Sequence, residues 1–504
     1  MQWCLQSKHF MKKQIVFIMV DSQSADMLGC YHNPYMKTPY LDSLSQEGLT
    51  FDAAYTCQPV CGPARSAIFT GLYPHSNGAW TNCVPLYDNV KTIGQRLRDH
   101  SIQTAYIGKW HLDGGDYFGN GICPDGWDKE YWYDMRCYLE ELTPEERVKS
   151  RDGSLSKQGE VKENFTFAHH CSNRAISYLN QHIDDNFLLV VSYDEPHDPC
   201  LCPEPYASMY DDFIEQKKEN VWDILEDKPS HQKVWAGDNV KADRGSLDIT
   251  PRRLYACNSY VDYEIGRVLD KIKKVAPDAM IIYTSDHGDM RASHCLYAKG
   301  PAPYDEITKI PLIVKYPNGF QGQRYPYPIS HIDLVPTILD YMNISLPKWL
   351  EGNSLLPAIK NPKIRINDAI FIEFGRYEID HDGFGGFQPM RCIFDGRYKL
   401  CINLLSEDEL YDLEKDTGEL HNLIEQEETI EIRNQLHDKL LDWMNHTRDP
   451  FRGYYWRTRP WRKDDFQPTW AYTGYTRQRE NEEYEPRQLD YCTGLEMKEA
   501  VRLK

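Results

Sequence analysis

Acids, histidines and lysines gather in four short segments of this 504-residue chain. Carboxylates beside a histidine suit a hard divalent cation, and lysines with further histidines suit an anionic substrate next to it. Any one segment has an ordinary explanation, because an Asp after a strand often caps a helix and most histidines are packed polar residues. Together they favour metal-assisted chemistry on an anion. The segments are Asp21, 108–111, 194–197 and 286–289.

Each segment directly follows a short apolar run. Runs rich in Val, Ile, Leu and aromatic residues recur between helical stretches, which is typical of a buried, mostly parallel sheet. Ligands of such sheets bind beyond the carboxyl ends of the strands. We therefore expect an α/β fold, with a large mostly parallel sheet flanked by helices. Four of its strands should end at one edge in acids, histidines or lysines. The runs span 14–20, 102–107, 186–193, 279–285 and 310–316.

Cys61 stands at the predicted start of a helix. Pro63 suits the first helical turn, and Gly71 suits the end. The backbone N–H groups and dipole at a helix N-terminus favour an anion, and Arg65 adds a fixed cation one turn further on. A reactive thiolate would also fit this position. Local physics therefore leaves two interpretations open, a thiol nucleophile and a structural cysteine.

The pattern changes beyond about residue 360. A strand is predicted at 369–374, and strands at 390–394 and 397–402 flank Asp395-Gly396, which favours a type I′ turn. Apolar residues at helical spacing across 425–445 predict a helix that packs on this small antiparallel sheet.

We accordingly predict three units along the chain. These are a catalytic α/β domain over 11–360, a small antiparallel subdomain with its packed helix over 361–447, and a C-terminal arm over 448–504. The arm is rich in aromatic residues, Arg and Pro, and we expect it to wrap the body or the neighbouring subunit of a homo-oligomer.

Composition and charge exclude several classes of protein. The 57 Lys and Arg against 76 Asp and Glu give a formal net charge of −19, which argues against a nucleic-acid partner. No apolar run approaches the ~18 residues needed to cross a membrane. Lys12 and Lys13 precede an apolar run, but Asp21 interrupts it and no small-residue cleavage site follows. The 15 irregularly spaced cysteines do not form a disulfide framework, so we expect a cytoplasmic enzyme with reduced thiols.

The sequence CGPAR at 61–65, with TG at 70–71, resembles the C-x-P-x-R…TG signature of the formylglycine-dependent sulfatases of the alkaline phosphatase superfamily. The resemblance extends from about residue 13 to about residue 425. Further motifs occur in the family's order, at 20–21, 108–112, 195–197, 284–288, 299–300, 396–400 and 409–413.

The resemblance implies an enzyme that cleaves sulfate monoesters. Cys61 would be oxidised by a maturase to formylglycine, whose hydrate supplies a hydroxyl nucleophile. One divalent ion, usually calcium, would lie beside it. Its implied ligands are Asp21, Cys61, Asp286 and His287.

The resemblance also implies roles for five residues around the nucleophile. Arg65 would hold and activate the hydrate, while Lys109 and Lys299 would bind the sulfate oxygens. His111 would act as the base that breaks the sulfated hemiacetal, and His197 would protonate or hydrogen-bond to the leaving oxygen. Cations aimed at the equatorial oxygens and an acid at the departing oxygen lower the barrier to such a reaction.

The chain departs from the family at one metal position. Many members carry a second carboxylate after the first Asp, and Ser22 followed by Gln23 stands there instead. An oxygen of Ser22, of Gln23 or of water could complete the shell, since calcium accepts six to eight oxygen ligands. The lower negative charge keeps open hydrolysis of phosphonate monoesters or phosphodiesters by the same site. A carbohydrate-binding protein that is never matured is the alternative outside enzymes.

The segment 373–382 is the predicted source of substrate recognition. It combines charge, aromatics and glycine after a strand, and loops in such places often carry recognition. Arg376 and His381 are its candidate substrate-binding residues, with a solvated loop as the alternative. Because the net charge of −19 repels long polysulfated chains, we expect a small sulfated carbohydrate as substrate.

Overall fold

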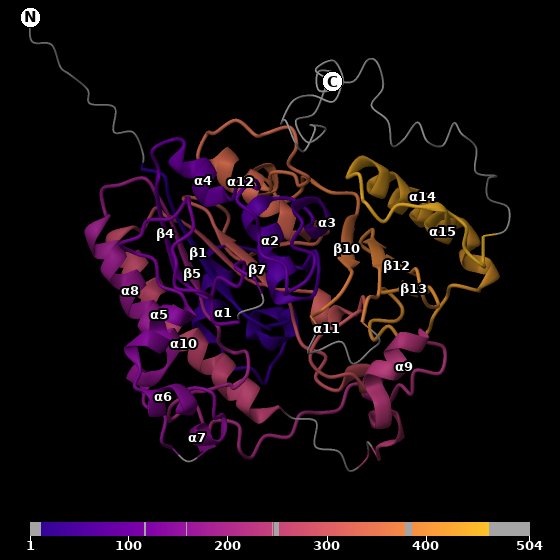
Figure 1. Ribbon diagram of the computed structural model, residues 1–504, viewed down its shortest axis with the longest axis horizontal. Coiled ribbons are helices and arrows are strands. Elements are labelled where there is room, and N and C mark those ends of the chain that lie inside the picture. Colours follow the sequence, from indigo (N-terminus) through magenta and orange to yellow (C-terminus); the bar gives the residue numbers. More distant parts are fainter. Residues whose placement is uncertain are drawn as a thin grey trace, which may run out of the picture.

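The computed structural model describes residues 12–114, 117–157, 159–243, 245, 251–378 and 386–462 (Figure 1). Its main sheet has seven strands in the order β4-β5-β1-β6-β7-β2-β8. The first four strands in this order are parallel to one another, and β7 is antiparallel to both of its neighbours. The seven strands are β1 (Gln14–Val20), β2 (Leu49–Phe51), β4 (Gln103–Gly108), β5 (Phe187–Ser192), β6 (Met280–Ser285), β7 (Leu312–Lys315) and β8 (Gln323–Tyr325).

Helices cover both faces of this sheet, as Figure 1 shows. Alternate side chains of β1 enter two different cores, with Val16 on one face and Phe17 on the other. The first core is closed by α1 (Pro39–Glu47), α8 (Phe167–Gln181) and α10 (Arg252–Val275). The second core is closed by α2 (Cys61–Thr70), α4 (Ile93–Arg98) and α12 (Leu334–Tyr341). Burial on both faces explains why the strands are apolar throughout.

Shorter elements connect these layers. The short strands β3 (Ala54–Tyr55) and β9 (Ile329–Ser330) pair in parallel. None of the described helices combines the length and apolar character needed to cross a membrane. The remaining helices of the large part are α3 (Pro74–Asn77), α5 (Met135–Glu141), α6 (Pro144–Lys149), α7 (Ser154–Lys157), α9 (Ser230–Ala236), α11 (Asp305–Thr308) and α13 (Leu356–Lys360).

A second, antiparallel sheet of four strands follows in the order β10-β11-β12-β13. The helix α14 (Ile430–His446) packs on it, and Leu436 and Leu440 share a buried core with Ile393 and Leu400 of the sheet. Both the small sheet and its helix were predicted from the sequence. The strands are β10 (Ile370–Phe374), β11 (Met390–Phe394), β12 (Tyr398–Asn403) and β13 (Glu409–Asp412).

The turn predicted between β11 and β12 is wrong in type. A type I′ turn needs positive φ at both central residues. Gly396 has φ 105°, but Asp395 is not among the residues with positive φ. The Asp395 N–H donates to the carbonyl of Tyr398 over 3.3 Å, so Gly396 and Arg397 form the centre of the turn. The Asp395 carboxylate instead accepts the N–H of Arg397 and of Tyr398.

The described start of the predicted arm packs on the small sheet's side of the molecule. It contains α15 (Tyr454–Arg457), and Trp456 is buried. The Arg459 Nε donates to Asp408 Oδ2 over 2.7 Å. The rest of the arm lies outside the described residues, and the three unit boundaries stay predictions.

Candidate active site

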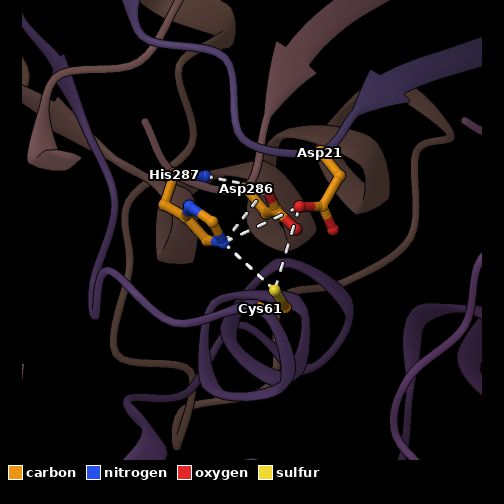
Figure 2. A group of neighbouring side chains, drawn as sticks. All are labelled: Asp21, Cys61, Asp286 and His287. Carbon is orange, nitrogen blue, oxygen red and sulfur yellow. Dashed lines mark hydrogen bonds and ion pairs between the residues drawn. The ribbon is translucent and has the colours of Figure 1, made fainter. Parts of the chain in front are cut away.

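The four predicted metal ligands converge at the carboxyl edge of the main sheet (Figure 2). Asp21 follows β1 and Asp286 follows β6, and these strands are paired in parallel with Val20 opposite Ser285. Cys61 comes from the first turn of α2 on the facing side. One donor atom from each of Asp21, Cys61, Asp286 and His287 lies within 4.8 Å of all the others, and all four side chains are buried.

The imidazole of His287 turns its Nε2 toward this cluster. Its Nδ1 lies 2.9 Å from the carbonyl oxygen of Gly288. Because a carbonyl can only accept, Nδ1 carries the proton. Nε2 therefore faces the cluster, 3.1 Å from Cys61 Sγ, as Figure 2 shows. This is the tautomer that a metal-binding histidine needs.

Arg65 binds both carboxylates of the cluster. Its Nε donates to Asp286 Oδ2 and its Nη2 to Asp21 Oδ2, each over 3.0 Å. Its Nη1 donates to the carbonyl oxygen of Lys109 and to the hydroxyl of Ser192. The guanidinium, fully buried, therefore fixes the two carboxylates and the ends of β4 and β5. Its predicted action on the hydrated nucleophile stays a proposal.

The two carboxylates have pKa values that are pushed apart. Burial and the neighbouring Asp21 raise the pKa of Asp286 to about 6. Burial also acts to raise the pKa of Asp21, but Lys109 and other cations outweigh it and hold the pKa well below its usual value. Like charges at close range produce such a split, and a bound cation would relieve it.

Two lysines add positive charge to the cluster. Lys109 Nζ lies 2.9 Å from Asp21 Oδ2 and 2.9 Å from Asp194 Oδ1. Lys299 Nζ lies 2.9 Å from the sulfur of Cys61. Burial and Asp21 act to raise the pKa of the Cys61 thiol, but Lys299 and other cations lower it well below its usual value. The position of Cys61 is thus built to hold an anion.

The two predicted catalytic histidines lie close to these cations. His111 is buried, and burial lowers the pKa of its imidazole, which favours the neutral form. Its Nδ1 has no hydrogen-bond partner in the described part of the chain. The His197 side chain is 20% exposed, and its Nε2 lies 3.4 Å from Lys299 Nζ. His197 thus borders solvent, where a departing alcohol would leave.

Residues 13–344 match the model of the Sulfatase family, and residues 293–446 match that of the N-sulphoglucosamine sulphohydrolase C-terminal region. The first match spans well over half of the chain. The chain belongs to the sulfatase family. It is a sulfuric ester hydrolase, a type I sulfatase of the alkaline phosphatase superfamily.

The sulfatase is 44% identical over 492 residues to "Uncharacterized sulfatase YidJ" of Escherichia coli, covering 96% of this chain and 97% of the relative. Its fold matches the structure of BT4656 in complex with its substrate D-glucosamine-2-N,6-O-disulfate, with a TM-score of 0.70, 21% identity, and coverage of 87% and 99%. It also matches the phosphonate monoester hydrolase of Agrobacterium radiobacter, with a TM-score of 0.69, 21% identity, and coverage of 86% and 96%. These structural likenesses concern the fold alone.

The two candidate additional ligands of this sulfatase differ in the partners of their side chains. The Ser22 hydroxyl donates to Asp21 Oδ1 over 2.8 Å. The side chain of Gln23 is used elsewhere, since its Nε2 donates to Asn258 and its Oε1 accepts from Tyr283, each over 2.6 Å. Both polar groups of the Gln23 amide are thus held by Asn258 and Tyr283, which favours Ser22 as the additional ligand.

The predicted recognition segment reaches the site at Tyr377. The carbonyl oxygen of Tyr377 accepts hydrogen bonds from the Asn82 N–H and the Thr81 hydroxyl, and the Tyr377 ring centre lies 5.8 Å from Lys299 Nζ. Arg376 is half-buried beside it. His381 lies outside the described residues. Substrate binding by these two residues stays a prediction.

The sequence analysis missed three polar residues of the site. Asn82 Oδ1 accepts the Gly62 N–H over 2.9 Å and so caps the first turn of α2. Ser192 orients Arg65, and Tyr117 contacts both Asp194 and His197. None of the three belongs to a recognisable motif, so no signal in the sequence distinguishes them from other polar residues.

Proposed function

We propose that the enzyme hydrolyses the sulfate ester of a small carbohydrate to the alcohol and inorganic sulfate. The nucleophile would be formylglycine made from Cys61, beside one divalent ion, most suitably calcium. The observation that carries the proposal is the position of Cys61 between the donor cluster and Lys299 Nζ, which lies 2.9 Å from its sulfur. A side chain held there would face both a metal and a substrate anion.

The residues fit a divalent cation. Asp21 and Asp286 bring two buried carboxylates whose pKa values are shifted in opposite directions, and His287 turns its Nε2 toward them. Replacement of the Cys61 sulfur by oxygen would make this set of donor atoms richer in hard oxygen ligands, which calcium prefers. The bound ion would supply Lewis-acid charge that activates and orients an oxygen nucleophile. Ser22 or water would complete the shell.

Lys109 and Lys299 are suited to bind the sulfate oxygens. Both ammonium groups are buried, and Lys299 already faces the position of the nucleophile. Preorganised charge in a site without bulk water stabilises the negative charge that develops on the equatorial oxygens. Arg65 would hold and activate the hydrated nucleophile, and it would also fix the two carboxylates that hold the ion.

The histidines are suited to proton transfer on opposite sides. His111, kept neutral by burial, can accept a proton from the oxygen attached at position 61 and so help release sulfate. His197, partly exposed beside Lys299, can give a proton to the departing oxygen. Aryl and alkyl esters should therefore differ in their need for His197.

The size and polarity of the substrate are inferred from charge. The net charge of −19 disfavours long polysulfated chains outside the local cationic site. Arg376 and His381 are proposed to contact the alcohol part. The substrate of BT4656, a disulfated glucosamine, is consistent with a sugar sulfate for this chain.

The test is a panel of sulfated monosaccharides, with an aryl phosphonate monoester beside them, assayed on protein co-produced with a formylglycine-generating maturase. We expect inorganic sulfate from at least one sugar sulfate, a slower reaction on the phosphonate, and neither reaction with a Cys61→Ala variant. Faster turnover of the phosphonate would overturn the sulfate preference and favour a phosphonate or phosphodiester hydrolase.

We also propose a cytoplasmic location and two protein partners for the enzyme. The 13 cysteines that the structure describes are unpaired, which supports a reducing, cytoplasmic location. The maturase is a required partner, and we expect neither nucleic acid nor a membrane as a partner. We further propose that residues 448–504 contact a second subunit of a homo-oligomer.

A further inference from the structure

Tyr117 lies between the predicted catalytic groups although no motif contains it. It is half-buried in the loop between β4 and α5. Its hydroxyl lies 2.5 Å from Asp194 Oδ1 and 3.1 Å from His197 Nδ1. Its ring covers Lys109, whose Nζ is 4.0 Å from the ring centre. One side chain thus contacts an acid, a histidine and a lysine of the site.

The direction of these hydrogen bonds follows from their acceptors. His197 Nδ1 also lies 3.0 Å from the carbonyl oxygen of Asp198, which can only accept, so Nδ1 carries a proton. Asp194 is buried, but Lys109 and other cations lower its pKa, so its carboxylate accepts. The Tyr117 hydroxyl therefore accepts from His197 Nδ1 and donates to Asp194.

The same chain of hydrogen bonds fixes the other nitrogen of His197. With Nδ1 turned toward Tyr117, Nε2 faces the cluster, 3.4 Å from Lys299 Nζ and 4.0 Å from Asp21 Oδ1. Arg151 supports the far end of the chain, with its Nη1 3.9 Å from Asp194 Oδ2 and its Cζ 5.1 Å from the Tyr117 ring centre.

We propose that Tyr117 is a positioning residue for departure of the alcohol, because it links Asp194 to His197 and holds His197 Nε2 toward the ester oxygen. The inference rests on the proposed function, in which His197 acts at that oxygen. In other histidine-dependent enzymes a carboxylate alone often orients the histidine. Here Tyr117, which belongs to no motif, would share that role. The Asp198 carbonyl still holds Nδ1 when the hydroxyl is absent, so the loss should be partial.

The test uses matured Tyr117→Phe, which deletes one oxygen and keeps the ring over Lys109. Two substrates separate a role in protonating the leaving oxygen from a general structural role. 4-Nitrophenolate leaves a sulfate ester without protonation, whereas a sugar alkoxide needs a proton. For the sugar sulfate we expect kcat to fall about tenfold, a part of the effect of a general acid. We expect KM for the sugar sulfate, and kcat for 4-nitrophenyl sulfate, to stay within about twofold, since binding and the other steps are untouched.

The matched control is Tyr131→Phe. Tyr131 also contacts a histidine, with its hydroxyl 2.8 Å from His182 Nε2, but in a pair away from the active site. We expect this variant to keep the wild-type rates on both substrates. A His197→Ala variant is measured in parallel. Like Tyr117→Phe, it should lose more activity on the sugar sulfate than on 4-nitrophenyl sulfate, and the difference should be larger.

Four outcomes would overturn the inference. Equal losses on both substrates would show that Tyr117 serves the structure of the site in general, and an unchanged kcat on the sugar sulfate would show no role. If His197→Ala discriminates between the substrates while Tyr117→Phe does not, the inference fails and the proposed function stands. If His197→Ala itself treats them equally, the proposed role of His197 fails as well.

Discussion

Lys299 Nζ and Cys61 Sγ lie 2.9 Å apart in a place from which solvent is excluded. The same ammonium group lies 3.4 Å from Nε2 of His197, at the solvent side of the site. Lys299 therefore lies close both to Cys61, the proposed site of the nucleophile, and to His197, beside which we propose that the alcohol leaves. A sulfate group bound between Cys61 and His197 would place one of its oxygens beside this ammonium group, which would stabilise the negative charge on that oxygen.

Loss of Lys299 is predicted to impair catalysis strongly. Lys299→Met should lower kcat on a sugar sulfate by about 10²–10³-fold, as expected for one preorganised electrostatic contact. Sulfate release measures the effect, and Lys91→Met, on an exposed side chain, is the control. A loss below about tenfold would argue against direct contact with the sulfate.

Loss of Arg65 is predicted to impair folding as well as activity. The guanidinium pairs with Asp21 and Asp286, and all three side chains are fully buried. Arg65→Ala leaves two buried carboxylates without their cation, which should lower the free energy of unfolding by about 3–5 kcal/mol in metal-free protein. Denaturant unfolding measures this, with the exposed Arg147→Ala as the control. An equal stability of the two variants would contradict the pairing.

Metal removal is predicted to abolish turnover reversibly. Dialysis against a chelator should stop sulfate release, and calcium should restore it. At about 100 times its Kd, calcium should add about 2.7 kcal/mol to the free energy of unfolding, because it binds the folded state. Asp286→Asn should lose this gain, since it removes a negative charge from the donor cluster. Full turnover by protein shown to be free of metal would exclude a metal-dependent site.

The stability of the protein is predicted to depend on the ionisation of Glu195. Burial and the neighbouring Asp194 raise the pKa of this carboxyl from 4.5 to about 8. Its Oε1 accepts the Ala168 N–H over 2.9 Å, and its Oε2 has no partner among the described residues. The folded state holds this proton more tightly than the unfolded chain does. Its contribution to stability is therefore full below pH 4.5 and is lost as the pH rises to about 8.

A neutral isostere should remove this dependence. The stability of Glu195→Gln relative to wild type should increase between pH 5 and pH 8, because glutamine cannot ionise, and should then become constant. Thermal unfolding across this pH range measures the difference, and Glu145→Gln, on an exposed side chain of α6, is the control. A difference that does not change with pH would show that Glu195 ionises as an ordinary surface group does.

Much of the fold and the centre of the site followed from local pattern. The run 14–20 is β1 itself, since a strand buried on both faces must be apolar along its whole length. The parallel sheet then brings Asp21 and Asp286 together, and the helix signal around Pro63 places Cys61 correctly at the start of α2.

Other parts of the site depend on contacts between distant segments. Asn82 and Tyr117 are positioned by their partners in the folded chain, so neither spacing nor composition distinguishes them. Ser22 and Gln23 are equal candidates for the metal shell in the sequence, and only the positions of Asn258 and Tyr283 favour Ser22. The turn at Asp395 was mistaken because its side chain caps the following backbone N–H groups, which sequence alone does not show.

The state of the side chain at position 61 is the most direct test. Protein co-produced with a maturase should yield a peptide containing position 61 that is about 18 Da lighter than the cysteine form, because oxidation replaces the thiol with an aldehyde. Sulfate release from a sugar sulfate should increase in proportion to the converted fraction. Equal sulfate release by protein that retains the intact thiol, or none by fully converted protein, would contradict the account.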